Sequence, residues 1–251
     1  MSIQKTADEL HAHKLQTLQE METYLTSLIT SEDNRDGAKA DKLCYWLQDW
    51  MTFLSFENEF SPMSLRRYKR GEIIKVHLGF NVGSEEGGLH YAVVIDKNNP
   101  KSSPVITIVP LTSVKPSTDI SKLRGGSIFL GNELFTNLNS KISTTERQLR
   151  KTVGELTDLV KNLNNVSDEE LNSFSKRVQN AQDELNLLEK MKRETRRMNR
   201  GSIALVNQIT TISKIRIYDP KTDHDILSTI KLSNEKLNLI DAEIQRKFTN
   251  L

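Results

Sequence analysis

His90 and Thr112 stand in separate blocks of the sequence, and their side chains suit proton transfer and the stabilisation of negative charge. Histidine has the unperturbed pKa nearest to neutral pH, so His90 could act as a general base or a general acid. The Thr112 hydroxyl could donate a hydrogen bond to an anionic oxygen. Lys214 and Arg216, in a later block, could supply positive charge. Such a set could carry out acid–base chemistry on an anionic group.

The segments that hold these residues have the pattern of short β-strands. They are rich in Val, Ile and Tyr, and segments rich in glycine, asparagine or proline separate them, among them the loop 83–88. The strands expected from this pattern are 73–78, 91–95, 105–109, 202–206 and 214–218. Short strands at this spacing predict a small antiparallel sheet or barrel.

Residues 1–60 have the apolar spacing of helices instead. On the first helix, leucines and a methionine recur three or four positions apart, at Leu15, Leu18, Met21, Leu25 and Leu28. Residues 31–37 form a polar break, and a second apolar stripe with Trp46, Trp50 and Phe53 follows it. Pro62 ends that helix because proline cannot continue the hydrogen-bond pattern.

Residues 132–198 return to a helical pattern and predict two arms of similar length. The break is expected at 164–167, where Ser167 and Glu170 form the pattern of a capping box that starts the second arm. The apolar stripes are narrow, as in a coiled coil, so we expect an antiparallel hairpin inserted into the sheet. A last helix is expected from about Asn234, with inward-facing apolar residues at Leu237, Ile240, Ile244 and Phe248.

Composition excludes several classes of protein. The longest apolar runs are too short for a transmembrane helix, and the polar residues 1–10 do not resemble a signal peptide. Cys44 is the only cysteine, which excludes a disulfide framework and a cysteine-rich zinc site, and favours a cytoplasmic protein. The 35 Lys and Arg against 33 Asp and Glu give a net charge of +2, so only local clusters can point to nucleic acid. A hydrophobic fraction of 36% is low for one large core and fits an elongated insert.

Four blocks in a fixed order carry a resemblance to a known family. They are 68–76 (Tyr-Lys-Arg-Gly-Glu-Ile-Ile-Lys-Val), 79–95 with its Gly-Gly-Leu-His, 109–113 (Val-Pro-Leu-Thr-Ser) and 201–217. In this order they resemble the PemK/MazF toxins of bacterial toxin–antitoxin systems, over about 68–131 and 199–251. The N-terminal region and the helical insert lie outside that resemblance.

The resemblance implies a fold and an activity. The implied fold is a small SH3-like antiparallel β-barrel with a C-terminal helix, usually a homodimer. The implied activity is that of an endoribonuclease, which cleaves single-stranded RNA such as mRNA without a metal or another cofactor and thereby arrests growth. An antitoxin protein is expected to cover the RNA groove.

The resemblance also implies a catalytic pair, an arginine after Gly-Gly-x and a threonine or serine in the Pro-x-Thr-Ser block. Thr112 matches the second position, whereas His90 stands where the arginine is expected. Residues 208–211 read Gln-Ile-Thr-Thr where the family commonly has Gln-Ile-Arg-Thr, so another family cation is replaced. His90 and Thr112 are therefore the expected catalytic residues. The expected RNA-binding residues are Ser84, Glu85, Gln208, Lys214, Arg216, Arg70, Arg196 and Arg197.

Each of these assignments has a structural alternative. His90 could be an ordinary residue at a strand edge, and Thr112 suits a strand by its propensity alone. Glu85 and Glu86 fit a solvated turn better than an acid–base pair. The basic cluster that contains Arg196 could be a solvated helix face, since acidic residues interrupt it.

The sequence thus predicts an α+β protein in four parts. These are an N-terminal helical region (1–62), the first part of the barrel (63–131), an inserted antiparallel coiled-coil hairpin (132–198), and the second part of the barrel with the C-terminal helix (199–251). The alternative to a ribonuclease is a non-catalytic module on the same barrel that binds RNA or a protein, as the gyrase poisons related to this family do. The N-terminal helices could mediate oligomerisation, cover the groove as an inhibitor, or pack on the outside of the barrel.

Overall fold

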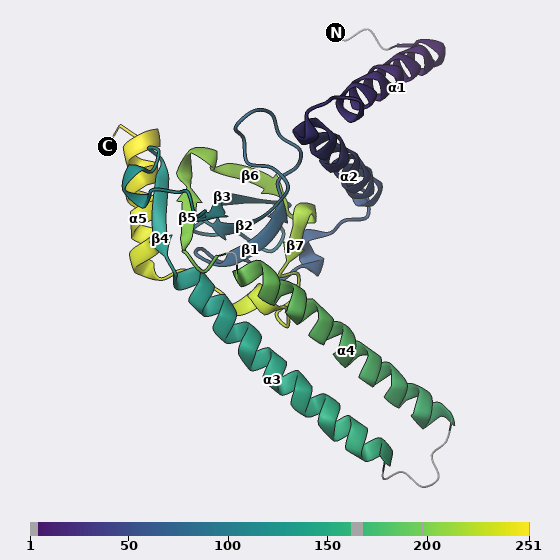
Figure 1. Cartoon of the computed structure of the whole chain (residues 1–251), viewed down its shortest axis with the longest axis vertical. Helices are drawn as coiled ribbons and strands as arrows, with labels where there is room; N and C mark the ends of the chain where they lie inside the picture. The colour runs from purple at the N-terminus through teal and green to yellow at the C-terminus, as the bar shows by residue number, and fades with distance from the viewer. Residues whose placement is uncertain (1–4, 162–167, 197, 251) are drawn as a thin grey trace. The chain divides into compact units, whose positions relative to one another are not determined.

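The computed structural model describes residues 5–161, 168–196 and 198–250 (Figure 1). The chain divides into two compact units, Met1–Glu59 with Gly79–Val82, and Phe60–Leu78 with Gly83–Leu251. It is an α+β protein with one antiparallel sheet and several helices. Within the described residues, no helix is long and apolar enough to cross a bilayer.

The first unit contains the two helices predicted for residues 1–60, α1 (Ala7–Ile29) and α2 (Asn34–Phe56). Thr6 starts α1 through a capping box with Glu9, and the Asp33 carboxylate caps α2 by accepting from the Arg35 N–H. Between them the described parts of α1 and α2 bury only Leu28 and Ala40. Much of the predicted apolar stripe is exposed, including Leu15, Leu18 and Trp50.

The second unit is built on a seven-stranded sheet in which every pairing is antiparallel. Its order is β4-β5-β3-β2-β1-β7, and β6 also pairs with β3. The strands are β1 (Ile73–His77), β2 (Leu89–Val94), β3 (Val105–Ser113), β4 (Ser127–Gly131), β5 (Ser202–Leu205), β6 (Thr210–Ser213) and β7 (Ile217–Asp219). Short 3₁₀ turns connect some of them: η1 (Pro62–Ser64), η2 (Ile120–Lys122), η3 (Val206–Gln208), η4 (Lys214–Arg216) and η5 (Ile226–Thr229).

Two sequence predictions about the sheet are wrong. The sheet is not a closed barrel, because in the described residues β4 and β7 stand at opposite ends of the strand order and do not pair with each other. The strand predicted at 214–218 begins only at Ile217. The Ile217 N–H donates to the Lys214 carbonyl and closes the turn η4, which takes up residues 214–216. Through this turn the chain passes from β6, which pairs with β3, to β7, which pairs with β1.

Alternation along the strands places apolar residues on both faces of the sheet. Ile73, Val93 and Val109 pack in one core with the helices and the C-terminal segment. Their neighbours Ile74 and Ala92 pack in a second core with Tyr68, Ile106 and Ile217. Both faces are therefore covered, which explains why the central strands are almost continuously apolar.

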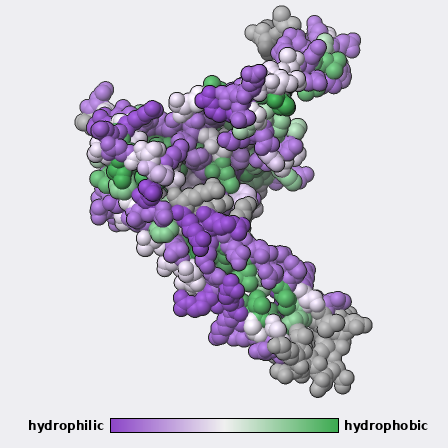
Figure 2. Space-filling model, viewed as in Figure 1, coloured by the Kyte–Doolittle hydropathy of each residue, from purple (hydrophilic) through white to green (hydrophobic). Residues whose placement is uncertain are grey.

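The insert forms two helices, α3 (Glu133–Lys161) and α4 (Asp168–Arg196), which lie side by side in opposite directions (Figure 1). We call them the helix pair. The base of α3 joins the first core through Leu134, Leu138 and Ile142, and α4 contributes Leu188 and Met191. Farther out, hydrophobic residues follow the line between the helices and hydrophilic ones cover the outer faces (Figure 2). Coiled-coil packing of the pair stays a prediction, and the predicted cap at Ser167 lies outside the described residues.

The last helix, α5 (Asn234–Phe248), begins where predicted, with the Ser233 hydroxyl accepting from the Lys236 N–H. Leu237 and Ile240 are buried in the first core and Ile244 packs against it. The inward orientation predicted for Phe248 is wrong, since that side chain is 54% exposed. Phe248 is the last residue of the helix, beyond the part that packs on the sheet.

We predict that Leu138→Ala destabilises the second unit by about 2–5 kcal/mol, because Leu138 is fully buried where α3 meets the sheet core. Urea unfolding followed by circular dichroism measures this change. Leu239→Ala on the exposed side of α5 is the matched control, with an expected change of less than about 0.5 kcal/mol. Equal effects of the two substitutions would contradict the packing of the helix pair into the core.

Candidate functional site

His90 and Thr112 lie on neighbouring strands at the same end of the sheet. Tyr91 pairs with Leu111 across β2 and β3, and His90 and Thr112 are the next residues beyond that pair. They share a cavity of about 390 Å³ lined by Lys75, Leu89, His90, Tyr91, Leu111, Thr112, Ser113 and Met198. We call this the first cavity. Residues from two separate sequence blocks are thus brought together as the chemistry requires.

The His90 ring lies between two hydrogen-bond acceptors. Its Nδ1 is 3.4 Å from the Leu111 carbonyl oxygen, and its Nε2 is 3.5 Å from a carboxylate oxygen of Glu86. Which nitrogen donates depends on the tautomer of the ring. The sequence around Glu86 predicts a solvated turn, whereas in the structure its carboxylate lies against the ring.

Gln208 holds the loop 83–88 beside the cavity. Its Nε2 donates to the Ser84 carbonyl at 3.1 Å, and its Oε1 accepts from the Glu86 N–H at 3.4 Å. Three predicted or newly found site residues, Ser84, Glu86 and Gln208, are therefore connected. Glu85 is exposed on the same loop. RNA contacts by Ser84, Glu85 and Gln208 stay predictions.

Lys75 is a cation of the first cavity that sequence reasoning missed. It is 7% exposed and its Nζ lies 5.7 Å from the Tyr91 ring centroid and 5.5 Å from that of Tyr218. A signal was present, because a lysine within the apolar run Ile73-Ile74-Lys75-Val76 is unusual in a buried strand. A buried ammonium group in this position can stabilise negative charge on a bound phosphate.

The predicted basic residues occupy different places. Lys214 is 1% exposed, with its Nζ donating to the Pro100 carbonyl at 3.2 Å, and burial lowers its pKa. Arg216 donates from Nε to the His77 carbonyl at 2.8 Å, at the end of β1 that pairs with Leu89, and burial lowers its pKa as well. We therefore leave Lys214 out of the proposed site and keep Arg216 as a neighbour of it.

Two further predicted arginines, Arg70 and Arg196, lie in different parts of the structure. Arg70 donates to the Ile95 carbonyl and pairs with Asp241 of α5, beyond the end of β2 opposite to His90, so the structure does not bring it to the cavity. Arg196 ends α4 and is exposed, two residues before the cavity residue Met198. Arg197 lies outside the described residues.

The residue types of the cavity fit chemistry by proton transfer and hydrogen bonding. Among the described residues, no group of three or more histidine, cysteine, aspartate or glutamate side chains is arranged to hold a metal ion. Residues 69–182 match the family model of the PemK-like, MazF-like toxin of type II toxin-antitoxin systems. This chain carries a domain of that family. No curated protein shows significant similarity to the chain.

The match confirms the family but differs in extent from the resemblance seen in the sequence. It covers β1 to β4, α3 and α4 as far as residue 182, and therefore includes much of the helix pair. Residues 199–251, with β5 to β7 and α5, lie beyond the matched segment. His90, Thr112, Lys75 and Glu86 all fall within the matched toxin domain.

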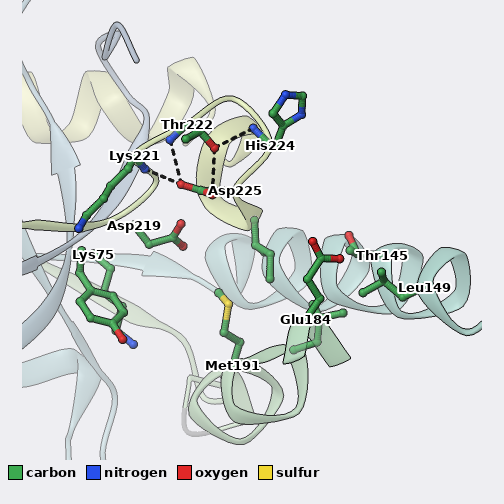
Figure 3. A pocket seen from close by; sticks show the side chains of 13 residues that line it. Lys75, Thr145, Leu149, Glu184, Met191, Asp219, Lys221, Thr222, His224 and Asp225 are labelled. Atoms are coloured by element: carbon green, nitrogen blue, oxygen red, sulfur yellow. Dashed lines mark hydrogen bonds between the residues drawn. The ribbon is translucent and has the colours of Figure 1, made fainter. Parts of the chain in front are cut away.

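A second cavity, of about 590 Å³, shares Lys75 with the first. Tyr218 and Asp219 of β7, the loop from Lys221 to Ile226, and the helix pair line it (Figure 3). The carboxylate of Asp225 holds the loop by accepting from the backbone N–H groups of Lys221 at 2.6 Å and Thr222 at 2.9 Å. The cavity is thus a formed space between the sheet and the helix pair.

Asp219 is the titratable group of this second cavity with the most perturbed pKa. Burial, reinforced by the negative charge of Asp225, raises its pKa from 3.8 to about 6, although Lys75 and the Leu227 N–H oppose the shift. Because the folded-state pKa lies above the unfolded one, the stabilisation is complete below pH 3.8 and is lost as pH rises through 6. The ionised carboxylate therefore lowers stability at neutral pH.

We predict that Asp219→Asn, which resembles the protonated carboxyl, makes the protein more stable than the wild type at pH 7.5 by up to about 3 kcal/mol. The difference should shrink as pH falls through about 6 and vanish near pH 4. Thermal unfolding across this pH range measures it. Asp223→Asn is the control, because Arg66 lowers the pKa of that exposed carboxyl and its replacement should not stabilise. A pH-independent effect of Asp219→Asn would contradict the assignment.

Proposed function

We propose that this protein is a toxin-type endoribonuclease that cleaves single-stranded RNA at the first cavity without a metal ion. The observation that carries the proposal is the convergence of His90 and Thr112 on one cavity, within a domain of the PemK-like, MazF-like toxin family. An antitoxin partner, a homodimeric state and the arrest of growth belong to the same proposal, since the family implies them.

The proposed reaction is an internal transesterification of RNA. The 2′-oxygen forms a bond to phosphorus, the bond from phosphorus to the 5′-oxygen breaks, and a 2′,3′-cyclic phosphate and a 5′-hydroxyl result. One proton leaves the 2′-hydroxyl and one is added to the departing 5′-oxygen. The reaction therefore needs a base, an acid and stabilisation of the pentacovalent phosphate.

We assign His90 the role of general acid, because its ring nitrogens can carry and donate a proton and its Nε2 lies 3.5 Å from a carboxylate oxygen of Glu86. Glu86, whose carboxylate contacts the same ring, is the base in this proposal. Thr112 donates a hydrogen bond to a phosphate oxygen, and Lys75 provides the positive charge that the family expectation gave to arginine. In this proposal the positive charge therefore comes from Lys75 on β1, whereas the family arginine would stand at the position of His90 on β2.

We predict that His90→Ala lowers the cleavage rate by about 10²–10⁴-fold and Thr112→Ala by about tenfold or more. The measurement is cleavage of single-stranded RNA by purified protein in EDTA, together with growth on expression. His11→Ala, on an exposed part of α1, is the control and should behave as the wild type. Full activity of both site variants would defeat the assignment. RNA binding by the wild type without any cleavage would favour the alternative, a non-catalytic binding module.

The exposed Arg196 extends the proposed RNA contact along α4 near the cavity. We predict that Arg196→Ala weakens binding of an uncleavable RNA and lowers the slope of log K against log salt by about 0.7, the value for one phosphate contact on a single strand. Arg177→Ala, exposed farther along the same helix, is the matched control. Fluorescence anisotropy at several salt concentrations measures both, and identical slopes for the two variants would remove Arg196 from the site.

A further inference from the structure

We infer that the second cavity binds a base of the RNA that flanks the cleaved position, and that guanine is the base it fits best. This inference rests on the proposed function. The cavity, with a volume of about 590 Å³, falls within the range of small-molecule sites, and its walls are largely apolar with a few polar groups. It is distinct from the first cavity that holds His90 and Thr112.

The position of the cavity suits a flanking nucleotide. Lys75 lines both cavities, so in this inference one RNA strand occupies both of them. The Lys75 Nζ lies against the rings of both Tyr91, in the first cavity, and Tyr218, in the second. A phosphate between two adjacent nucleotides can therefore approach this cation while the bases occupy the two cavities.

The walls offer a stacking surface on one side and an apolar surface on the other. Tyr218 is 54% exposed, which leaves ring surface for a base to stack on. Opposite it, the helix pair contributes Leu149, Leu188 and Met191. In Figure 3 the side chain of Met191 points into this space, whereas the ring of His224 points away from it.

Asp219 supplies the specificity in this proposal. Its carboxylate points into the same space, and it accepts the Leu227 N–H while keeping capacity for further hydrogen bonds (Figure 3). Guanine presents two adjacent N–H donors on its Watson–Crick edge, which match the two oxygens of one carboxylate. Adenine and cytosine present a donor beside an acceptor, and uracil places its one donor between two acceptors, so each fits an ionised carboxylate less well.

The cost of Asp219 to the fold supports a functional role. A carboxyl whose ionisation is opposed by burial and by a neighbouring carboxylate lowers stability at neutral pH, and such residues cluster at binding and catalytic sites. A bound guanine would compensate this cost by donating to the ionised form. The helix pair gains a role as well, since it forms one wall and so takes part in the choice of base.

The test is the cleavage profile of a randomised single-stranded RNA cut in EDTA, with the 5′ ends of the products sequenced. The wild type should prefer guanine at one position beside the cut. Asp219→Asn should reduce that preference by about tenfold or more, as expected for loss of a two-bond contact to a base. Tyr218→Ala should weaken selection at the same position without altering the others.

Asp223→Asn is the matched control, since Asp223 is in the same loop region but its side chain is 80% exposed and pairs with Arg66. Its profile should equal that of the wild type. Unchanged profiles for Asp219→Asn and Tyr218→Ala, with cleavage intact, would overturn the inference while leaving the proposed function standing, and would favour a protein segment as the occupant. Absence of cleavage by the wild type would instead overturn the proposed function, and the inference with it.

Discussion

The antiparallel register of β1, β2 and β3 is the constraint on which the rest of the structure depends. The pair Tyr91–Leu111 sets His90 beside Thr112, and the pair Val76–His90 sets β1 against the same strand. Because side chains alternate with a period of two, a slip of one residue would turn His90 and Thr112 to the opposite face and Ile74 and Ala92 out of their core. The same apolar residues that hold the sheet together thus fix the geometry of the candidate site.

The helix pair packs against the sheet from which it extends. Its base is part of the first core, so α3 and α4 are anchored by Leu138, Ile142 and Met191 rather than hanging from two loops. An anchored base allows side chains of the pair to form a wall of the second cavity. The helix pair therefore borders the space next to the candidate site.

Much of the fold could be predicted from the sequence, and two members of the candidate site were found there as well. Periodicity located α1, α2 and α5 and the central strands, and the Gly-Gly-x-His and Pro-x-Thr blocks pointed to His90 and Thr112. The burial of Lys214 could not be predicted, because a lysine in a strand-like segment is normally exposed. The contact of Glu86 with His90 could not be predicted either, because it depends on hydrogen bonds between Gln208 and a loop distant in sequence. Closure of the barrel failed as a prediction because strand pairing at the sheet ends is a tertiary property that no local pattern records.

The bridge from Gln208 to the loop 83–88 has a consequence for biosynthesis. The segments that contain His90 and Thr112 leave the ribosome well before Gln208 does. The strands β5 and β6, which pair with β3 on the side opposite to β2, are made at about the same time as Gln208. A nascent chain that has been completed only through the helix pair has the reactive side chains but neither the neighbouring strands nor the bridge that orders the loop. The candidate site is therefore assembled only after β5, β6 and Gln208 have been made, long after the segments that contain His90 and Thr112.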